Sequence, residues 1–299
     1  MNKVMVSLIG EQPLPNLLPI RHEQPKEVLL AYTRETEDVG KRLQEVLERH
    51  AHIHLLEVRP FNIEATGRLL RDYIIGRGWK PEQLVFNLTG GTKAMSIAAY
   101  KLAETGRSQF LYLQSEGAKN LLYRYRFDKN GEIAPDGEDD IPGVISLDDY
   151  LRIHLRKYSL RAFPAGDGGR FEKIIFEALE KSVDEILHGV NYVGGFDIDI
   201  VLRCGNQVGI AEVKSGKQAL DSHGIKQLNL AGRREFLGIY TKKFLIQSEI
   251  WGATYNGYRE FAKQSEITVI ELPSYKRDGD LSSDDRQRLV KDVLTVLGG

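Results

Sequence analysis

Residues 194–216 read GGFDIDIVLRCGNQVGIAEVKSG, and this stretch predicts two β-strands joined by a tight turn. Residues 196–203 and residues 207–214 alternate in polarity and are rich in β-branched side chains, as strands are. The sequence CGN between them, at 204–206, favours a turn. We therefore predict a hairpin whose strands lie well inside a folded core.

The charged residues of this hairpin fall on shared faces. Because side chains alternate along a strand, Asp197 and Asp199 share one face of the first strand. Glu212 and Lys214 likewise share one face of the second strand. Pairing of the strands can bring carboxylates and an ammonium together, which suits a hard divalent cation that prefers oxygen ligands. A lysine beside such a cation can orient or deprotonate a water molecule.

A hairpin with one solvated face would show the same alternation of charge, and that is the simpler explanation of the pattern. Two features favour a functional site instead. The positions between the charges are apolar, which indicates a core where charged groups need a reason; they are Ile198, Ile200, Val201, Ile210 and Val213. In addition, residues 169–176, GRFEKIIF, open a predicted helix that carries a third carboxylate, Glu172.

Glu172, Asp199 and the sequence Glu-Val-Lys at 212–214 together resemble the core motif of the PD-(D/E)xK nucleases, which is a helix glutamate, a strand aspartate and Glu-x-Lys on the next strand. The resemblance implies a metal-dependent endonuclease that uses Mn²⁺ or Mg²⁺. The catalytic residues that it implies are Glu172, Asp199, Glu212 and Lys214. The metal ligands that it implies are Asp199, Glu212 and Val213.

The composition is that of a globular protein. The chain has 299 residues, of which 41% are hydrophobic and 28% charged, and this length suffices for two domains. No apolar run reaches the length of a membrane span, and residues 1–15 lack the features of a secretory signal. A single cysteine, Cys204, excludes an intrachain disulfide. We therefore expect a cytoplasmic protein with no membrane partner.

The charge pattern gives little support for a large nucleic-acid surface. A formal net charge of −1 provides no overall basic field, so any contact with a polynucleotide would be local. The pairs Arg233-Arg234 and Lys242-Lys243 are examples of such local charge. The alternating histidines at 50, 52 and 54 could gather a metal ion, but no cysteine or carboxylate cluster accompanies them, and surface positions explain them more simply.

Strands and helices alternate in the first half of the chain. We predict strands at 3–10, 27–33, 54–58, 83–88 and 108–114, and helices at 36–50, 63–76 and 92–104. The proline-containing residues 11–16 are predicted to be a loop, and residues 120–127 a hairpin strand. This alternation predicts a parallel sheet covered by helices on both faces.

A stretch rich in acids, glycine and proline, 128–143, is predicted to contain a turn and the interdomain linker. We accordingly place one domain at 1–140 and a second at 141–299. Ser146, with Asp149 three residues later, marks the start of a helix. In the second domain we predict helices at 146–158, 170–187, within 217–236, near 255–263 and at 282–297, and late strands at 243–248 and 267–272.

A second informative stretch, FNLTGGTKAMSIAAY at 86–100, joins a predicted strand to a predicted helix. Gly90 and Gly91 would let backbone amides approach a ligand at the positive end of the helix, where Thr92 and Lys93 add a hydroxyl and a cation. This pattern predicts an anion site, most simply for phosphate, although the spacing of a P-loop is absent. An ordinary strand–helix turn with Thr92 as the N-cap would look the same.

The sequences NLTGGTK at 87–93 and SLIGEQPLPN at 7–16 resemble those of CARF domains, and the whole chain resembles the CARF-nuclease effectors of type III CRISPR systems. The resemblance implies a Rossmann-like CARF domain followed by a restriction-endonuclease-like α/β domain. It further implies a homodimer that binds cyclic tetra-adenylate and then cleaves single-stranded DNA, RNA or both, with nicking of double-stranded DNA as a further option. The implied messenger-binding residues are Gly10, Glu11, Gln12, Pro13, Asn16, Thr33, Asn87, Thr89, Gly90, Gly91, Thr92 and Lys93.

Two other functions stay open at this point. The chain could be a cyclic-oligoadenylate sensor or regulator whose nuclease fold is inactive or structural, although the intact set Asp199, Glu212 and Lys214 argues against this. It could also be a constitutive nuclease without a messenger, which the glycine-rich loop at 87–93 argues against. The sequence determines neither the ring size of the messenger nor the preference between DNA and RNA.

Overall fold

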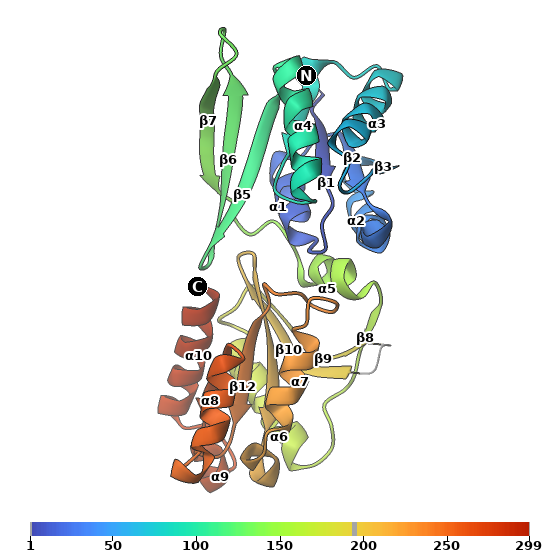
Figure 1. Ribbon diagram of the computed structural model, residues 1–299. Coiled ribbons are helices and arrows are strands. Elements are labelled where there is room, and N and C mark those ends of the chain that lie inside the picture. Colours follow the sequence, from blue (N-terminus) through green and yellow to red (C-terminus); the bar gives the residue numbers. More distant parts are fainter. Residues whose placement is uncertain (1, 193–195, 299) are drawn as a thin grey trace. The chain divides into compact units, whose positions relative to one another are not determined.

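The computed structural model describes residues 2–192 and 196–298. The chain divides into two compact units, Met1–Val144 and Ile145–Gly299 (Figure 1). Each unit is built on its own β-sheet with helices packed against it, so the predicted α/β class is confirmed. Within the described residues, no helix combines the length and the apolar character that crossing a membrane requires.

The first unit has a sheet with the strand order β3-β2-β1-β4-β5-β6-β7, in which β1 to β5 run parallel and β6 and β7 antiparallel. Its strands are β1 (Val4–Leu8), β2 (Glu27–Tyr32), β3 (His52–Glu57), β4 (Leu84–Asn87), β5 (Gln109–Glu116), β6 (Lys119–Phe127) and β7 (Ile133–Asp140). Its α-helices are α1 (Leu14–Glu23), α2 (Glu37–Leu47), α3 (Ile63–Gly76) and α4 (Lys93–Gly106). The apolar faces of α3 and α4 pack on the side chains of β1 and β4 in one core.

The loop predicted at 11–16 extends only to Pro13, because α1 begins at Leu14. Prolines at the start of this segment suggested a loop, but proline fits the first turn of a helix, where its missing N–H has no intrahelical acceptor. The interior Pro19 is buried in α1. The last residue of α1, Glu23, pairs with Lys3, just before β1, and with Arg124 of β6, which ties the helix to two parts of the sheet.

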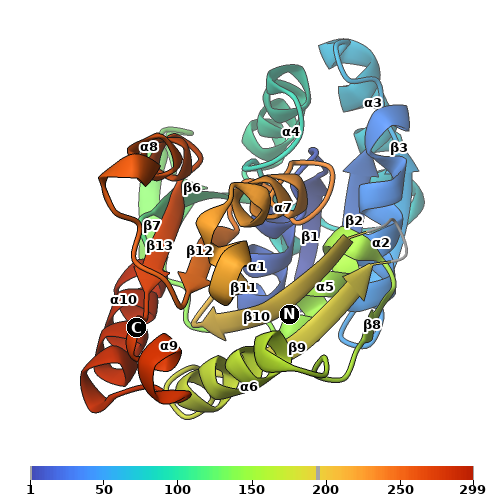
Figure 2. The ribbon, with the colours of Figure 1, turned by 90° about the horizontal axis from the view of Figure 1, so that it is seen from below.

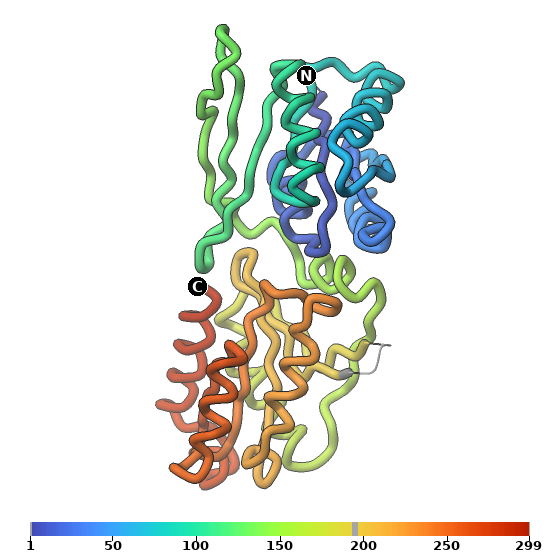
Figure 3. The backbone as a smooth tube through the Cα atoms, in the orientation of Figure 1, coloured from blue at the N-terminus to red at the C-terminus, as the bar shows by residue number. Residues whose placement is uncertain are grey.

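The turn and linker predicted at 128–143 are wrong for half of that stretch, because β7 occupies Ile133–Asp140 and pairs with β6. Figure 3 follows the chain through this antiparallel ribbon. The acids of β7 do not prevent a strand, since cations of β6 meet them: Arg124 pairs with Asp139 at 2.7 Å, and Arg126 with Asp136 at 3.3 Å. An edge strand also tolerates its proline.

The second unit has a sheet with the strand order β13-β12-β11-β10-β9-β8, with parallel pairing from β11 to β13 and antiparallel pairing from β8 to β11. Its strands are β8 (Tyr158–Leu160), β9 (Glu185–Tyr192), β10 (Phe196–Cys204), β11 (Gln207–Lys214), β12 (Lys242–Gln247) and β13 (Ile267–Glu271). Its α-helices are α5 (Leu147–Leu155), α6 (Asp167–Leu179), α7 (His223–Ala231), α8 (Asn256–Gln264), α9 (Ser274–Asp278) and α10 (Ser283–Leu297). In Figure 2, α6 lies on one face of this sheet and α7 on the other.

The predicted hairpin is confirmed by the pairing of β10 with β11, whose register runs from Ile200 opposite Ala211 to Cys204 opposite Gln207. The first two glycines of the quoted stretch, at 194 and 195, lie outside the described residues. The Ser146 cap is also confirmed, since its hydroxyl accepts from the Asp149 N–H at 3.0 Å. The helix predicted at 170–187 is too long: α6 ends at Leu179, and the following residues form β9 beside β10.

Candidate functional site

Three carboxylates meet where the hairpin of the second unit faces the start of α6. Ile200 of β10 pairs with Ala211 of β11; Asp199 directly precedes the first and Glu212 directly follows the second. Helix α6 contributes Glu172. All three residues are buried, with exposed fractions of 6% for Asp199, 3% for Glu212 and 7% for Glu172. Asp197, by contrast, is exposed to solvent. The structure therefore brings the predicted acids together, and we call them the carboxylate cluster.

Cationic and backbone groups hold the carboxylate cluster in place. Asp199 accepts through Oδ2 from the Val213 N–H at 2.8 Å and through Oδ1 from Arg161 Nη2 at 2.6 Å. Arg161 Nη1 lies 3.3 Å from Glu172 Oε2, and His188 Nε2 lies 2.9 Å from the same oxygen. One arginine thus bridges two of the three acids.

Lys214 pairs with the third acid. Its Nζ donates to Glu212 Oε1 at 2.5 Å. Burial raises the pKa of Glu212 to about 8; the charge of Asp199 raises it further, and the charge and hydrogen bond of Lys214 oppose the rise. Burial and the nearby charge of Glu172 also raise the pKa of Asp199. Burial lowers the pKa of Lys214, but Glu212 together with Asp199 and Glu172 outweighs burial, so the pKa of the lysine is raised.

The chemistry of the carboxylate cluster fits a hard divalent cation. Its donors are carboxylate oxygens, and the raised pKa of both hairpin acids means that the cluster favours additional positive charge. In the described part of the chain, no group of three or more His, Cys, Asp or Glu side chains is arranged as a ready metal site. The contacts explain this arrangement, because Arg161 and Lys214 direct oxygens of the acids toward themselves.

Sequence reasoning did not identify Arg161 or His188. Arg161 lies between the helices predicted at 146–158 and 170–187. His188 lies just after the end of the second of these helices, so its place in strand β9 was not predicted. Gly189, next to His188, makes room for Arg161: its φ is +62°, and a Cβ there would lie 2.4 Å from Arg161 Cγ. A glycine following a histidine was the available signal, and it is too common to be recognised without the fold.

In the first unit, the loops that follow β1, β2 and β4 meet at the carboxyl ends of the strands. A Cβ at Gly10 would lie 3.2 Å from the Gly91 backbone nitrogen, so the loops after β1 and β4 touch. Thr36 Oγ1 accepts from the Thr33 N–H at 3.0 Å and donates to the Ile9 carbonyl. These bonds join the loop after β2 to the loop after β1. This edge is where open α/β sheets bind ligands.

The two glycines of the β4 loop are required by the packing. A Cβ at Gly90 would lie 2.2 Å from the Leu8 carbonyl oxygen. Gly91 has a φ of +73°, and a Cβ there would lie 2.9 Å from Leu8 Cβ. The loop therefore runs directly over the end of β1 and leads into α4, whose N-terminal N–H groups lie at this edge.

The polar side chains of this loop are already bonded to the protein. Asn87 accepts through Oδ1 from the Thr89 N–H at 3.1 Å, and Thr89 Oγ1 accepts from the Leu113 N–H at 2.8 Å. Thr92 caps α4 by accepting from the Met95 N–H at 3.3 Å, and its hydroxyl donates to the Pro60 carbonyl. These side chains shape the loop, which leaves backbone groups, rather than hydroxyls, to contact a ligand.

Asn16 has open hydrogen-bonding capacity at this edge. The residue is fully buried, and neither its Nδ2 nor its Oδ1 has a partner among the described residues. A buried amide without a partner is costly, so such a group commonly meets a water molecule or a ligand. Its Nδ2 lies 3.1 Å from the position that a Cβ at Gly90 would take. Of the other residues predicted to bind the messenger, Lys93 and Glu11 are exposed, Gln12 is half-buried, and Pro13 is buried.

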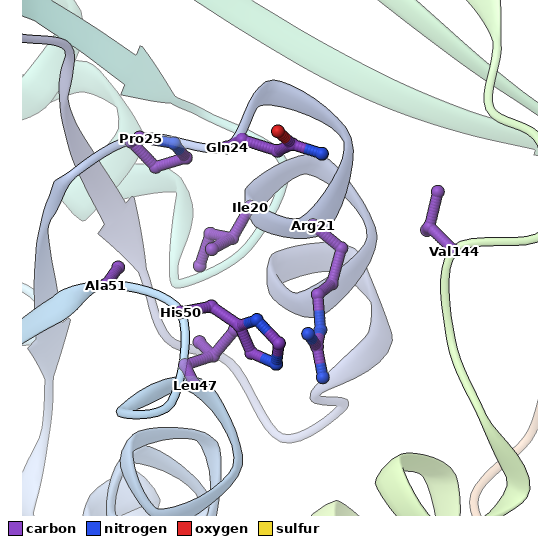
Figure 4. A pocket seen from close by; sticks show the side chains of 8 residues that line it. All are labelled: Ile20, Arg21, Gln24, Pro25, Leu47, His50, Ala51 and Val144. Carbon is purple, nitrogen blue, oxygen red and sulfur yellow. The ribbon is translucent and has the colours of Figure 1, made fainter.

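A separate pocket of about 420 Å³ lies on the same unit (Figure 4). Two of its lining segments immediately precede β2 and β3, so the pocket is at the amino ends of those strands, away from the glycine loop. It is lined by Ile20, Arg21, Gln24, Pro25, Leu47, His50, Ala51 and Val144. Its position does not match the ligand edge predicted from the sequence.

Comparisons with known proteins assign the fold. Residues 4–150 match the family described as the Card1 CARF domain. The chain is similar to Can2 from Sulfobacillus thermosulfidooxidans, solved in complex with cyclic tetra-adenylate, with a TM-score of 0.73 and 14% identity over 100% of this chain and 98% of that chain. Protein VC1899 from Vibrio cholerae gives a TM-score of 0.73 and 14% identity over 99% of each chain.

A type III CRISPR defence DNA nuclease activated by cyclic oligoadenylate gives a TM-score of 0.61 and 17% identity, over 85% of this chain and 46% of that chain. No curated protein matches the sequence. At these identities the likeness to the solved structures establishes the fold, and the activity has to be argued from the sites.

Proposed function

We propose that the protein is a nuclease activated by cyclic tetra-adenylate in type III CRISPR defence, because residues 4–150 match the Card1 CARF domain. The first unit binds the messenger, and the second unit cleaves nucleic acid with Mn²⁺ or Mg²⁺. The observation that carries the proposal is the coexistence of two sites in one chain: a glycine loop over the end of β1, and buried acids with a lysine on a hairpin.

The messenger site is the carboxyl edge of the first sheet. The glycine loop supplies backbone N–H groups at the start of α4, and an anion is favoured there by the helix dipole. Asn16 adds a buried amide whose hydrogen bonds are unsatisfied within the described chain. Lys93, exposed on the first turn of α4, adds a positive charge. These groups suit the phosphate and polar edge of a nucleotide.

A two-fold homodimer would complete this site. One chain provides one glycine loop, whereas cyclic tetra-adenylate has four phosphates arranged symmetrically around a ring. A symmetric dimer places an identical loop opposite the first and matches the symmetry of the ligand. The messenger activates only if it binds the working arrangement of the two subunits better than the resting one.

The nuclease site is the carboxylate cluster with Lys214. Asp199 and Glu212, together with the main chain at Val213, would hold the divalent cation, and Glu172 supports them from α6. When bound, the cation supplies electrostatic stabilisation to the phosphate under attack. The Val213 N–H fixes the Asp199 carboxylate, and the Lys214 ammonium orients the attacking water or offsets negative charge on the phosphate.

The substrate is single-stranded DNA, RNA or both, with nicking of double-stranded DNA as a further option, and the protein acts in the cytoplasm. The test is to incubate the purified protein with labelled DNA and RNA and Mn²⁺, with and without cyclic oligoadenylates of each ring size. Cleavage that depends on both Mn²⁺ and cyclic tetra-adenylate supports the proposal. Cleavage that persists in EDTA, or equal rates with and without messenger, would exclude it.

The second candidate function is a messenger-binding regulator with an inactive nuclease fold. The ion pairs of Arg161 and Lys214 favour this second function, because they balance the negative charge of the three acids without a metal ion. The same experiment separates the two functions, because a regulator would bind the messenger and leave every labelled substrate intact.

A further inference from the structure

Arg161 bridges two of the three acids of the carboxylate cluster. It lies between β8 and α6, and its guanidinium contacts Asp199 Oδ1 at 2.6 Å and Glu172 Oε2 at 3.3 Å. Its side chain is 24% exposed, compared with 72% for Arg277 in the same unit. The ion pairs of Arg161 with two buried acids therefore differ from an ion pair on the protein surface, because both acids are shielded from water.

The backbone around Arg161 is held in place. Its N–H donates to the Gly189 carbonyl at 2.8 Å, and its own carbonyl lies 3.3 Å from His188 Nδ1. His188 in turn stacks on Phe163, with 3.6 Å between the ring centroids, and reaches Glu172 through Nε2. Gly189 permits this approach, since any side chain there would meet Arg161. The fold thus delivers this arginine to the acids.

The contacts of Asp199 leave little room for a second cation. The Val213 N–H binds Oδ2, and Arg161 binds Oδ1, so both carboxylate oxygens are engaged. A divalent cation placed on Oδ1 would stand within a few ångströms of the guanidinium. Repulsion between like charges is strong at that distance in a buried site.

We propose that Arg161 is the counter-cation of Asp199 and Glu172, and that a divalent cation binds the carboxylate cluster by displacing the Arg161 guanidinium from Asp199. The inference rests on the metal-binding half of the proposed function. A purely positioning role makes the opposite prediction: removal of the guanidinium would then disorder the acids and weaken the binding of the cation. The direction of the change in affinity distinguishes these two roles.

The experiment measures Mn²⁺ binding by the full-length protein without messenger or nucleic acid, from the electron paramagnetic resonance signal of free Mn²⁺. The variants are R161Q, which removes the charge, and R161K, whose ammonium is compact and cannot bridge both acids as the planar fork does. R277Q is the matched control, because it removes an exposed arginine of the same unit. E212Q identifies the site, since Mn²⁺ bound at the carboxylate cluster should be lost in it.

We expect R161Q to bind Mn²⁺ about tenfold more tightly than the wild type or better, R161K to lie between them, and R277Q to match the wild type. Mn²⁺ should also raise the unfolding temperature of R161Q more than that of the wild type. If R161Q does not fold, the comparison of R161K with the wild type decides.

Equal or weaker Mn²⁺ binding in the Arg161 variants, with the wild-type site identified by E212Q, overturns the displacement and leaves the metal site standing. If neither the wild type nor any Arg161 variant binds Mn²⁺, the metal-binding half of the proposed function falls as well. The two failures are therefore distinguishable.

Discussion

The side-chain amide of Asn87 donates to the main-chain carbonyl of Pro15 at 3.1 Å. In a regular helix that carbonyl would accept from the N–H four residues later, but position 19 is a proline and has none. Pro19 thus leaves an acceptor on α1, and Asn87 at the end of β4 satisfies it. The Asn87 amide also donates to Ser7 Oγ at 3.2 Å, so the residue joins three elements at the ligand edge.

We expect Asn87→Ala to lower the free energy of unfolding by about 1–3 kcal/mol, because it leaves the partly buried Pro15 carbonyl without a donor. It should also loosen the glycine loop and weaken messenger binding. Urea unfolding measures the first effect and calorimetric titration the second. Asn130→Ala, at an exposed turn, is the control and should change neither. An Asn87 variant as stable as the wild type would show that the bond to Pro15 contributes nothing.

Removal of either hairpin acid should abolish cleavage and leave messenger binding intact. Asp199→Ala or Glu212→Ala takes a ligand from a hard-cation site in the second unit, whereas the messenger binds the first. The measurements are cleavage of labelled DNA and RNA and a binding titration with cyclic tetra-adenylate. Glu177→Ala removes an exposed acid of α6 and should behave as the wild type. Full activity of both acid variants would refute the nuclease assignment.

Lys214→Ala should still bind Mn²⁺ but lose turnover by about 100-fold or more, since its ammonium acts on the water or on the charge that develops at the phosphate. Single-turnover cleavage with saturating messenger measures the effect. Lys276→Ala removes an exposed lysine paired with Glu249 and provides the control. Wild-type rates in the Lys214 variant would mean that this lysine only neutralises Glu212.

Cyclic tetra-adenylate should bind with a stoichiometry of one per two chains. Lys93→Ala should raise the messenger concentration for half-maximal activation about tenfold or more, because each subunit loses one charged contact to phosphate. The maximal cleavage rate should stay unchanged. Calorimetry gives the stoichiometry, and Lys101→Ala, at an exposed position of the same helix, is the control. Binding of one messenger to each monomeric chain would contradict this mechanism.

The pairing of Glu23 predicts a dependence of stability on pH. Burial opposes ionisation of Glu23, but Lys3 and Arg124 outweigh it and hold the pKa of this carboxyl below its ordinary value. The ionised form therefore stabilises the fold above the ordinary pKa, and this contribution is lost as the pH falls through the folded-state value. Glu23→Gln should be destabilised at pH 7, and its difference from the wild type should shrink below about pH 4.

Urea unfolding from pH 3 to pH 7 measures this difference, with Glu82→Gln as the control at an exposed position. A constant gap across the range would show that Glu23 acts through packing rather than through its charge.

The parts of the fold and of the candidate site that could be predicted are those whose signals are local. The β10–β11 hairpin follows from alternation around a short turn, and the grouping of Asp199, Glu212 and Lys214 follows from the period of two along its strands. The glycines at 90 and 91 mark a backbone that passes close to Leu8, as a strand–helix turn requires. In each case neighbouring residues determine the geometry.

The parts that could not be predicted depend on tertiary partners. The acidic residues of β7 form a strand because Arg124 and Arg126 of β6 face them, and composition alone favours a linker. The interior proline of α1 is tolerated because Asn87, far along the chain, satisfies the carbonyl that it leaves open. Arg161 enters the carboxylate cluster from a segment without any motif. Only the fold brings these residues together.

The division of the chain after Val144 has a consequence for calorimetry. Each unit encloses its own hydrophobic core, one around β1, β4, α3 and α4, and the other around α6, α10 and the second sheet. Separate cores permit separate melting, so a heat scan need not give one cooperative peak. Messenger would then shift the peak of the first unit and Mn²⁺ that of the second, which lets one thermogram report the half of the protein that each ligand occupies.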